Sequence, residues 1–327
     1  MSGAIAGTAI LKNINPSDEL KTITLTINNS CNLSCPHCYL QYNKKNILLS
    51  EQTINSIFKS DFKHLAIVGK EPLVNYESTQ LVQSLIKKCK KMGKSISLIT
   101  NGTGLENYGE LLLDGVDYVD VSFDGGPQTY DINRKGKFHK IVKAINVLQE
   151  KSKIVFNALH TIHSDNLENI DDMLELKHYA DFSIIMFSPY LRTYNDGTNN
   201  VSSINLEGIL KKLSTSSSFR KTTNAYLLID TYHLQQNAIS KELVEHLISQ
   251  YSLESKIKLF AKDALLYGII RVTFDDLVLT PEESLHPLNY VDTLRQASTL
   301  DLNKTFVELK ETFYKNKYDN KRADLFV

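Results

Sequence analysis

The sequence has no excess of charge of either sign and no long apolar run. Lys+Arg and Asp+Glu both number 37, so the formal net charge is zero. A neutral chain has no global electrostatic reason to bind nucleic acid or an acidic membrane surface. No apolar run reaches the length of a membrane span, and residues 1–10 lack the basic region of a signal peptide. We therefore expect a cytoplasmic protein with no nucleic-acid or membrane partner, in which thiols stay reduced.

Cysteine is scarce, and its distribution is uneven. Three of the four cysteines, Cys31, Cys35 and Cys38, fall within eight residues in a C-x3-C-x2-C pattern. Thiolates so close in sequence can converge on one soft metal centre, and three ligands leave a coordination position open for chemistry. Two alternatives stand beside this interpretation. His37 could complete a structural zinc site, although adjacent residues rarely reach the same face of one ion, and a disulfide would need an oxidising compartment.

Strand-like and helix-like segments alternate through the first 190 residues. Strands are predicted at 22–27, 64–68, 95–99, 118–123, 154–161 and 182–187, and helices at 50–60, 79–92, 108–113, 138–149 and 167–178. This order predicts a parallel α/β fold. Polar or glycine-containing motifs recur just after the strands, where parallel α/β barrels place their functional groups. Six units are too few for a closed eightfold barrel, although 327 residues leave room for an appended domain.

The motifs follow the strands in a fixed order. They are Gly69-Lys70-Glu71-Pro72, Thr100-Asn101-Gly102, Ser122-Phe123-Asp124-Gly125, Tyr130-Asp131-x-x-Arg134, Asn157 on the fifth strand and Phe187-Ser188-Pro189-Tyr190 at the end of the sixth. Together with the cysteine loop, these motifs resemble those of the radical S-adenosylmethionine (radical SAM) enzymes. The SPASM-type branch, which modifies peptides, is the nearest. Each motif alone is weak, and their shared order is the specific feature.

This resemblance implies a partial (β/α)6 TIM-like barrel with a C-terminal α+β cap. It also implies one 4Fe–4S cluster on the three cysteines, with SAM on the fourth iron. The resemblance assigns SAM contacts to His37, Tyr39, Gly69, Glu71, Thr100, Asn101, Ser122, Asp124, Arg134, Asn157 and Ser188. Among these, Glu71 would hold the SAM ammonium and short polar groups would meet the ribose hydroxyls. Arg134 would face the SAM carboxylate or a substrate, unless it is a surface arginine that opens a helix. No catalytic residue can be named.

Three features do not match the family pattern. Lys70 replaces the second glycine of the Gly-Gly-Glu-Pro motif, where a side chain restricts the backbone. Cys89 lies in a lysine-rich helix and is expected to be a packing residue. His160 points to the strand face opposite Asn157, and we expect it to be a polar residue with satisfied hydrogen bonds.

The domain boundaries predicted from this pattern are an N-terminal extension at 1–20, a radical SAM core barrel at 21–195 and a cap at 196–327. Within the cap we expect a loop at 192–203, a serine-rich linker at 213–218, helix at 241–266 and a hairpin at 268–280. The hairpin faintly resembles the core of the SPASM extension. Because a single cysteine lies outside the triad, a thiolate-ligated auxiliary cluster cannot be built there.

The resemblance implies reductive cleavage of SAM to a 5′-deoxyadenosyl radical, which abstracts a hydrogen atom from a substrate. The leading hypothesis is a ribosomally made peptide that is crosslinked or epimerised. Only about twenty residues precede the first strand. A separate leader-peptide-recognition protein, or a groove under the cap, would then recognise the peptide. The alternatives are a small molecule such as a nucleotide or sugar, and a non-catalytic metal-binding protein. An enzyme of this kind also needs an electron donor such as flavodoxin or ferredoxin.

Overall fold

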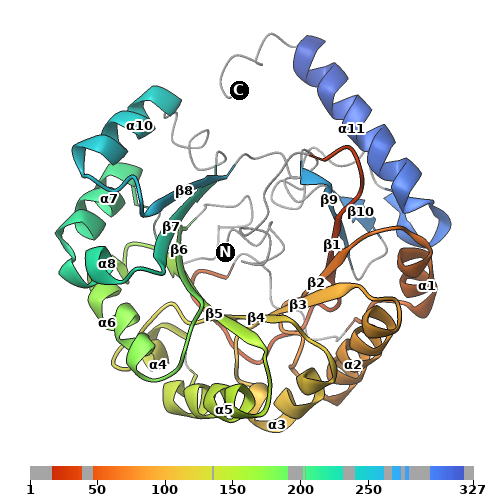
Figure 1. The fold of residues 1–327 in the computed structure, drawn as a ribbon, viewed down its shortest axis with the longest axis horizontal. Coiled ribbons are helices and arrows are strands. Elements are labelled where there is room, and N and C mark those ends of the chain that lie inside the picture. The colour runs from red at the N-terminus through yellow and green to blue at the C-terminus, as the bar shows by residue number, and fades with distance from the viewer. Residues whose placement is uncertain are drawn as a thin grey trace.

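The fold is described from a computed structural model. The described residues are 17–38, 47–134, 136–190, 202, 204–230, 240–260, 267–273, 277–279 and 295–319. Helices lie along the outer side of a curved sheet (Figure 1). No helix within these residues has the length and apolarity needed to cross a bilayer.

One sheet of eleven strands organises the protein, in the order β11-β10-β9-β1-β2-β3-β4-β5-β6-β7-β8. The strands are β1 (Thr22–Thr26), β2 (His64–Val68), β3 (Ser95–Thr100), β4 (Tyr118–Ser122), β5 (Val155–Ile162), β6 (Ile184–Pro189), β7 (Ala225–Asp230), β8 (Ile257–Phe260), β9 (Ile269–Val272), β10 (Leu277–Leu279) and β11 (Arg295–Gln296). Every neighbouring pair from β9 to β8 is parallel, and β10 and β11 are antiparallel additions. The α/β class and the partial-barrel architecture are confirmed.

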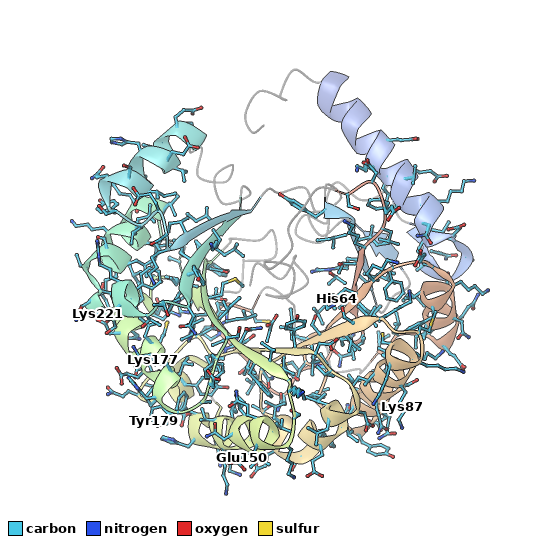
Figure 2. The ribbon with its side chains drawn as sticks, in the orientation of Figure 1. His64, Lys87, Glu150, Lys177, Tyr179 and Lys221 are labelled. Carbon is cyan, nitrogen blue, oxygen red and sulfur yellow. The ribbon has the colours of Figure 1, made fainter. Side chains whose placement is uncertain are left out.

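The helices lie on the outer side of the sheet (Figure 1). They are α1 (Glu51–Lys59), α2 (Tyr76–Lys91), α3 (Leu105–Tyr108) with η2 (Gly109–Asp114), α4 (Tyr130–Arg134), α5 (Phe138–Lys151), α6 (Ile170–Glu175) between η3 (Leu167–Asn169) and η4 (Leu176–His178), α7 (Leu206–Thr215), α8 (Ser217–Lys221), α10 (Lys241–Gln250), η9 (Ala297–Thr299) and α11 (Leu302–Asp319). The helices from α1 to α10 connect consecutive parallel strands, and η9 and α11 follow the last strand. Ser50 caps the N-terminus of α1, because its side chain accepts a hydrogen bond from the Thr53 amide. Lys87 and Glu150 face outward from α2 and α5, whereas His64 lies at the sheet (Figure 2).

The two faces of the sheet differ in chemistry because side chains alternate along each strand. The outer face carries Ile23, Leu65, Leu98 and Val119, which belong to the buried core under the helices. The inner face carries buried polar residues: Thr24, Ser97, Asp120, Asn157 and Arg271. The hydrophobic core therefore lies between sheet and helices, and the inside of the barrel is polar.

The C-terminal third joins the same sheet on both sides. Strands β7 and β8 extend it beyond β6, and β9 pairs in parallel with β1. The amides of Lys21 and Thr22 both donate to the Gly268 carbonyl, at 2.7 and 2.9 Å. The predicted hairpin is confirmed, because Val272 of β9 pairs antiparallel with Val278 of β10.

Two predictions for this region are wrong. The serines at 213–218 do not form a linker, since α7 ends at Thr215 and α8 begins at Ser217. Ser216 lies between the two helices and caps α8 by accepting from the Phe219 amide, which is why the serine-rich composition suggested a break. The range 241–266 is helical only to residue 250, and residues 257–260 form β8, whose parallel pairing with β7 selects an extended backbone. Residues 261–266 and, apart from Ser202, the predicted loop at 192–203 lie outside the described residues.

Candidate cofactor site

The cysteine loop begins where β1 ends. Cys31, Cys35 and Cys38 form no disulfide and are partly exposed. A turn closes the second half of the loop, because the Cys38 amide donates to the Cys35 carbonyl at 3.1 Å. The first half is tied to the end of β3, where Asn101 Nδ2 donates to Cys31 Sγ at 3.6 Å. Tyr39, one of the eleven predicted SAM contacts, lies outside the described residues.

The electrostatics of this loop disfavour bare thiolates at Cys31 and Cys35. Burial raises the pKa of Cys31 to about 11, and the negative charges of Glu71, Cys35 and Cys38 raise it as well, against a backbone hydrogen bond from Leu33. Burial also raises the pKa of Cys35, which the positive charge of Arg134 partly offsets. A cationic group in contact with the sulfurs would reverse this preference, because thiolates are the metal-binding form.

The donor set fits an iron–sulfur cluster better than a zinc ion. Among the described residues, no group of three His, Cys, Asp or Glu side chains is arranged to hold one metal ion. Three thiolates on a cluster bind different irons, so they need not approach one another as closely as around a single ion. The zinc alternative required His37, but its Nε2 lies 2.8 Å from Asp124 Oδ2. That contact uses one ring nitrogen and leaves Nδ1 buried without a hydrogen bond, so zinc is disfavoured by the missing three-ligand group among the described residues.

Glu71 lies just beyond β2 and is held from three directions. Its Oε1 accepts from the Leu73 amide at 2.9 Å and from Thr100 Oγ1 at 2.6 Å, and its Oε2 accepts from the Asn101 amide at 2.6 Å. Burial raises the pKa of Glu71, while these donors favour its ionised form. A carboxylate offers about four acceptor positions, so one of them remains for a ligand.

Gly69 and Lys70 shape the turn that presents this carboxylate. A Cβ on Gly69 would stand 2.5 Å from Asn28 Oδ1, so the position tolerates only glycine as the structure stands. Asn28 itself donates to the Glu71 carbonyl at 2.8 Å and accepts from the Lys70 amide at 3.1 Å.

Burial lowers the pKa of Lys70, whereas the charges of Cys38 and Cys31 raise it. The residue that departs from the family glycine therefore brings a cation toward the cysteine loop.

Asp124 follows β4 and joins three segments. Its Oδ2 accepts from Arg134 Nε and Nη2, both at 2.7 Å, and lies beside His37. Its Oδ1 accepts from the Thr161 amide at 2.5 Å. Burial opposes ionisation, but the charges of Arg134 and His37 hold the pKa of Asp124 well below its usual range. Arg134 is only 3% exposed. The alternative of a surface arginine is therefore wrong.

The remaining predicted contacts lie on the inner face of the sheet. Ser122 is buried at the end of β4, and Ser188 of β6 is in register with Thr161 of β5. Asn157 lies deeper in the barrel and donates to Asp120 Oδ1 at 2.8 Å. The structure thus gathers Gly69, Glu71, Thr100, Asn101, Asp124 and Arg134 around the cysteine loop and leaves Asn157 toward the middle of β5.

Two other predictions concern residues outside this group. His160 does face away from Asn157, but its expected hydrogen bonds are absent. Both ring nitrogens are buried without a partner, and the ring stacks on Phe187 with centroids 5.0 Å apart. Burial lowers the pKa of His160 to about 4. Cys89 is buried on α2 within the core, as expected of a packing residue.

Sequence reasoning missed several residues that build the site. Asn28 supports Glu71, Asn166 donates to the Thr161 carbonyl at 2.8 Å, and His163 stacks on His37 with centroids 5.3 Å apart. Asn28 stands directly before the cysteine loop, which is a positional signal. No motif includes the other two: Asn166 hydrogen-bonds to Thr161 only five positions away, and the partner of His163 is distant in sequence.

An open parallel α/β barrel with three cysteines and buried carboxylates at the carboxyl ends of its strands defines a cofactor-dependent barrel domain. The family model of the Radical SAM superfamily matches residues 25–176. This match identifies residues 25–176 as a radical SAM domain. The superfamily's enzymes use a 4Fe–4S cluster and SAM, which are therefore the cofactors of this domain.

Individual relatives agree with this assignment. The chain is 30% identical over 204 residues to a probable GTP 3′,8-cyclase of Methanocaldococcus jannaschii, covering 58% of this chain and 66% of the relative. It is 25% identical over 201 residues to the cysteine-type anaerobic sulfatase-maturating enzyme of Clostridium novyi, covering 54% of each chain. The chain thus spans about two thirds or less of the length of these relatives.

Solved structures show the same fold. Streptococcus suis SuiB bound to S-adenosylmethionine matches with a TM-score of 0.61 at 12% identity, covering 91% of this chain and 68% of SuiB. The anSMEcpe structure with bound AdoMet matches with a TM-score of 0.56 at 19% identity, covering 88% of this chain and 83% of that protein.

Proposed function

We propose that the chain is a radical SAM enzyme that abstracts a hydrogen atom from a ribosomally synthesised peptide. When bound, the reduced cluster and SAM supply a 5′-deoxyadenosyl radical. The observation that carries the proposal is the position of three cysteines after β1, none of them in a disulfide, beside the buried Glu71 carboxylate that follows β2. The chain's own work is to hold, orient and shield these groups.

The residues divide this work between them. Cys31, Cys35 and Cys38 would ligate the cluster and leave one iron for SAM. The remaining acceptor position of Glu71 suits the SAM ammonium, because Thr100 and Asn101 already fix the orientation of the carboxylate. Ser122, buried on the inner face, would meet the ribose, and Ser188, in register with Thr161, would lie near the adenine. Asn157 and Asp120 lie deeper, where a substrate would enter.

Two observations favour a peptide. The Tyr130-Asp131-x-x-Arg134 motif resembles that of peptide-modifying members, and the relatives include maturases of protein substrates, among them the Clostridium novyi enzyme. Crosslinking and epimerisation both begin with hydrogen abstraction, so either product is compatible with this site. A leader-peptide-recognition partner and a flavodoxin- or ferredoxin-type donor belong to the same proposal.

A nucleotide is the second candidate, and the relative from Methanocaldococcus jannaschii favours it. A nucleoside triphosphate needs several cations to hold its phosphates. On the inner face of the described strands, the register places two cationic side chains, Arg271 of β9 and Lys258 of β8, and Lys258 lies over the Tyr226 ring. Asp120 adds a buried carboxylate to the same face. This balance of charge suits a polar, nearly neutral substrate better than a triphosphate.

The test is anaerobic cluster reconstitution followed by dithionite and SAM, with 5′-deoxyadenosine measured by mass spectrometry. We expect product from the wild type and none from Cys35→Ala. Cys89→Ala is the matched control, because Cys89 is a thiol buried in the core away from the loop, and it should retain full activity. A wild-type protein that binds no iron would refute the proposal. Turnover with GTP, and with no peptide, would establish the second candidate.

A further inference from the structure

Both carboxylate oxygens of Asp124 are in contact with groups of the protein itself. Its two carboxylate oxygens receive Arg134 Nε, Arg134 Nη2 and the Thr161 amide and lie against His37 Nε2. Three of these groups, Arg134 Nε, Arg134 Nη2 and His37 Nε2, converge on Oδ2, and the Thr161 amide donates to Oδ1. The side chain is 1% exposed, and the residue adopts φ +53°, a strained backbone angle for a residue with a side chain. Such a carboxylate holds protein groups rather than the ribose hydroxyls that the family pattern suggested.

Arg134 is equally committed to the protein. It is the last residue of α4 and directs two guanidinium nitrogens at a single Asp124 oxygen. The helix is itself anchored, because Tyr130 Oη donates to the Asn101 carbonyl at 3.3 Å. A buried ion pair is strongly destabilised when one partner is removed, because the other charge is left without compensation. The pair is therefore a rigid point of attachment beside the loop.

His37 connects this point to the metal ligands. It lies between Cys35 and Cys38 in the chain, within the turn closed by their backbone hydrogen bond. Its ring is buried against His163, and its Nε2 reaches Asp124. Fixing this ring therefore restricts both flanking cysteines. Cys31 is tethered separately through Asn101, so each half of the loop has its own anchor.

We propose that Asp124 and Arg134 are positioning residues for the cysteine loop: they hold His37, and through it they place Cys35 and Cys38 to receive the cluster. This inference rests on the proposed function, because it assumes that the loop binds a cluster. In this role Asp124 and Arg134 bind other groups of the protein and do not contact SAM or substrate.

The first test is hydrogen exchange of peptides covering 31–38 in cluster-free protein under anaerobic conditions. Asp124→Asn replaces an acceptor oxygen by a donor and should speed exchange of the Cys35 and Cys38 amides about tenfold. Asp172→Asn is the matched control: Asp172 accepts from the Gly126, Gln128 and Thr129 amides in the neighbouring turn and does not contact His37. It should leave exchange of the loop unchanged.

The second test is iron retention after reconstitution and the EPR spectrum of the reduced cluster with and without SAM. Asp124→Asn and Arg134→Gln should retain several-fold less iron during chelator challenge and broaden the EPR signal. Arg134→Lys keeps the cation and should recover part of both. His37→Phe cuts the link and leaves the ion pair in place. This variant therefore tests the proposal if the charge variants do not fold. We expect its hydrogen-exchange rate and its iron loss to match those of Asp124→Asn.

The outcomes separate the two proposals. If the wild type takes up no iron, the proposed function fails, whereas the exchange data still decide whether the pair orders the loop. If the wild type binds a cluster, and Asp124→Asn and His37→Phe exchange and retain iron as the wild type does, the positioning role is overturned. Faster exchange with unchanged iron retention also overturns it, since the order would then have no bearing on the cluster.

Discussion

At the scale of single residues, His160 is the least expected feature of the fold. Its ring occupies the apolar layer between β5 and the helices, where it stacks on Phe187 and leaves both nitrogens without hydrogen bonds. Burial favours the neutral ring, with a pKa of about 4. The unfolded chain binds a proton near pH 6.5, so folding must release it at lower pH.

We predict that His160→Phe reduces the loss of stability on acidification. Because the folded pKa is lowered, the penalty begins as pH falls below 6.5 and grows until about pH 4. It amounts to about 1.4 kcal/mol per pH unit for this group. Between pH 7 and pH 5, the variant should lose about 2 kcal/mol less free energy of unfolding than the wild type.

Urea unfolding at the two pH values measures this difference. His64 and His163 also have pKa values lowered to about 4 by burial, so the slope should decrease rather than vanish. His246→Phe, on the exposed side of α10, is the control and should not change the slope. An unaltered slope in His160→Phe would show that this ring does not titrate with folding.

Gly69 gives a second prediction at this scale. Gly69→Ala should lower the free energy of unfolding by about 2 kcal/mol, because the added methyl displaces the Asn28 side chain from Glu71 and Ser78. Gly93→Ala is the control, since its φ is +63° and nothing lies within 4 Å of the added carbon. It should cost about 1 kcal/mol of backbone strain. Guanidinium titration measures both, and no loss in Gly69→Ala would mean that Asn28 moves aside at no cost.

At the scale of elements, the short helices depend on tertiary contacts. Helix α8 has five residues, too few to form alone. Its side chain Phe219 is fully buried, meets Phe187 of β6 edge-on with centroids 5.7 Å apart and lies under Lys256 Nζ. This ring therefore fixes the position of α8 against the sheet.

We predict that Phe219→Ala destabilises the protein by about 3 to 5 kcal/mol, through lost burial and the cavity left behind. Leu243→Ala in α10 is the control, because that side chain is 46% exposed, and it should change stability by less than about 0.5 kcal/mol. Thermal unfolding of the two variants side by side measures the contrast. A small loss in Phe219→Ala would mean that α8 can repack around the vacated space.

Elements also show where sequence patterns succeed and fail. The strand at 64–68 was predicted to the residue, because its apolar run ends at a glycine turn. Strand β8 was predicted as helix, since its four residues carry no alternation strong enough to override the helical pattern before them. The β8 segment is extended because it pairs with the edge of β7, and this pairing is not visible in the sequence of the segment itself.

The candidate site divides in the same way. The cysteines, Glu71 and Asp124 could be predicted because each is part of a short motif at the end of a strand. The contact between His37 and Asp124 could not, because 87 positions separate the residues and only the parallel sheet brings them together. Motifs predict which groups are present, and the pairing of buried charges depends on the tertiary fold.

At the scale of the whole molecule, the first strand depends on the last third of the chain. Strand β1 pairs with β9, Asn303 exchanges hydrogen bonds with Asp61, and Lys310 reaches Asp18. We predict that deleting residues 267–327 makes the protein aggregate, because it leaves the edge of β1 with unpaired backbone groups. Size-exclusion chromatography measures this. Asn303→Ala is the control and should remain monodisperse, and a soluble truncated protein would refute the dependence.

The polar inner face described above bears on how such a protein can change over evolutionary time. Stability resides in the layer between sheet and helices, so substitutions at inner positions such as Ser97 or Met186 remove little apolar burial from that layer. A lineage could exchange these side chains one by one, and with them the molecule that the barrel accepts, while the scaffold stays folded. Because the hydrophobic core and the inner face of the barrel are separate, substrate specificity can change with little loss of stability.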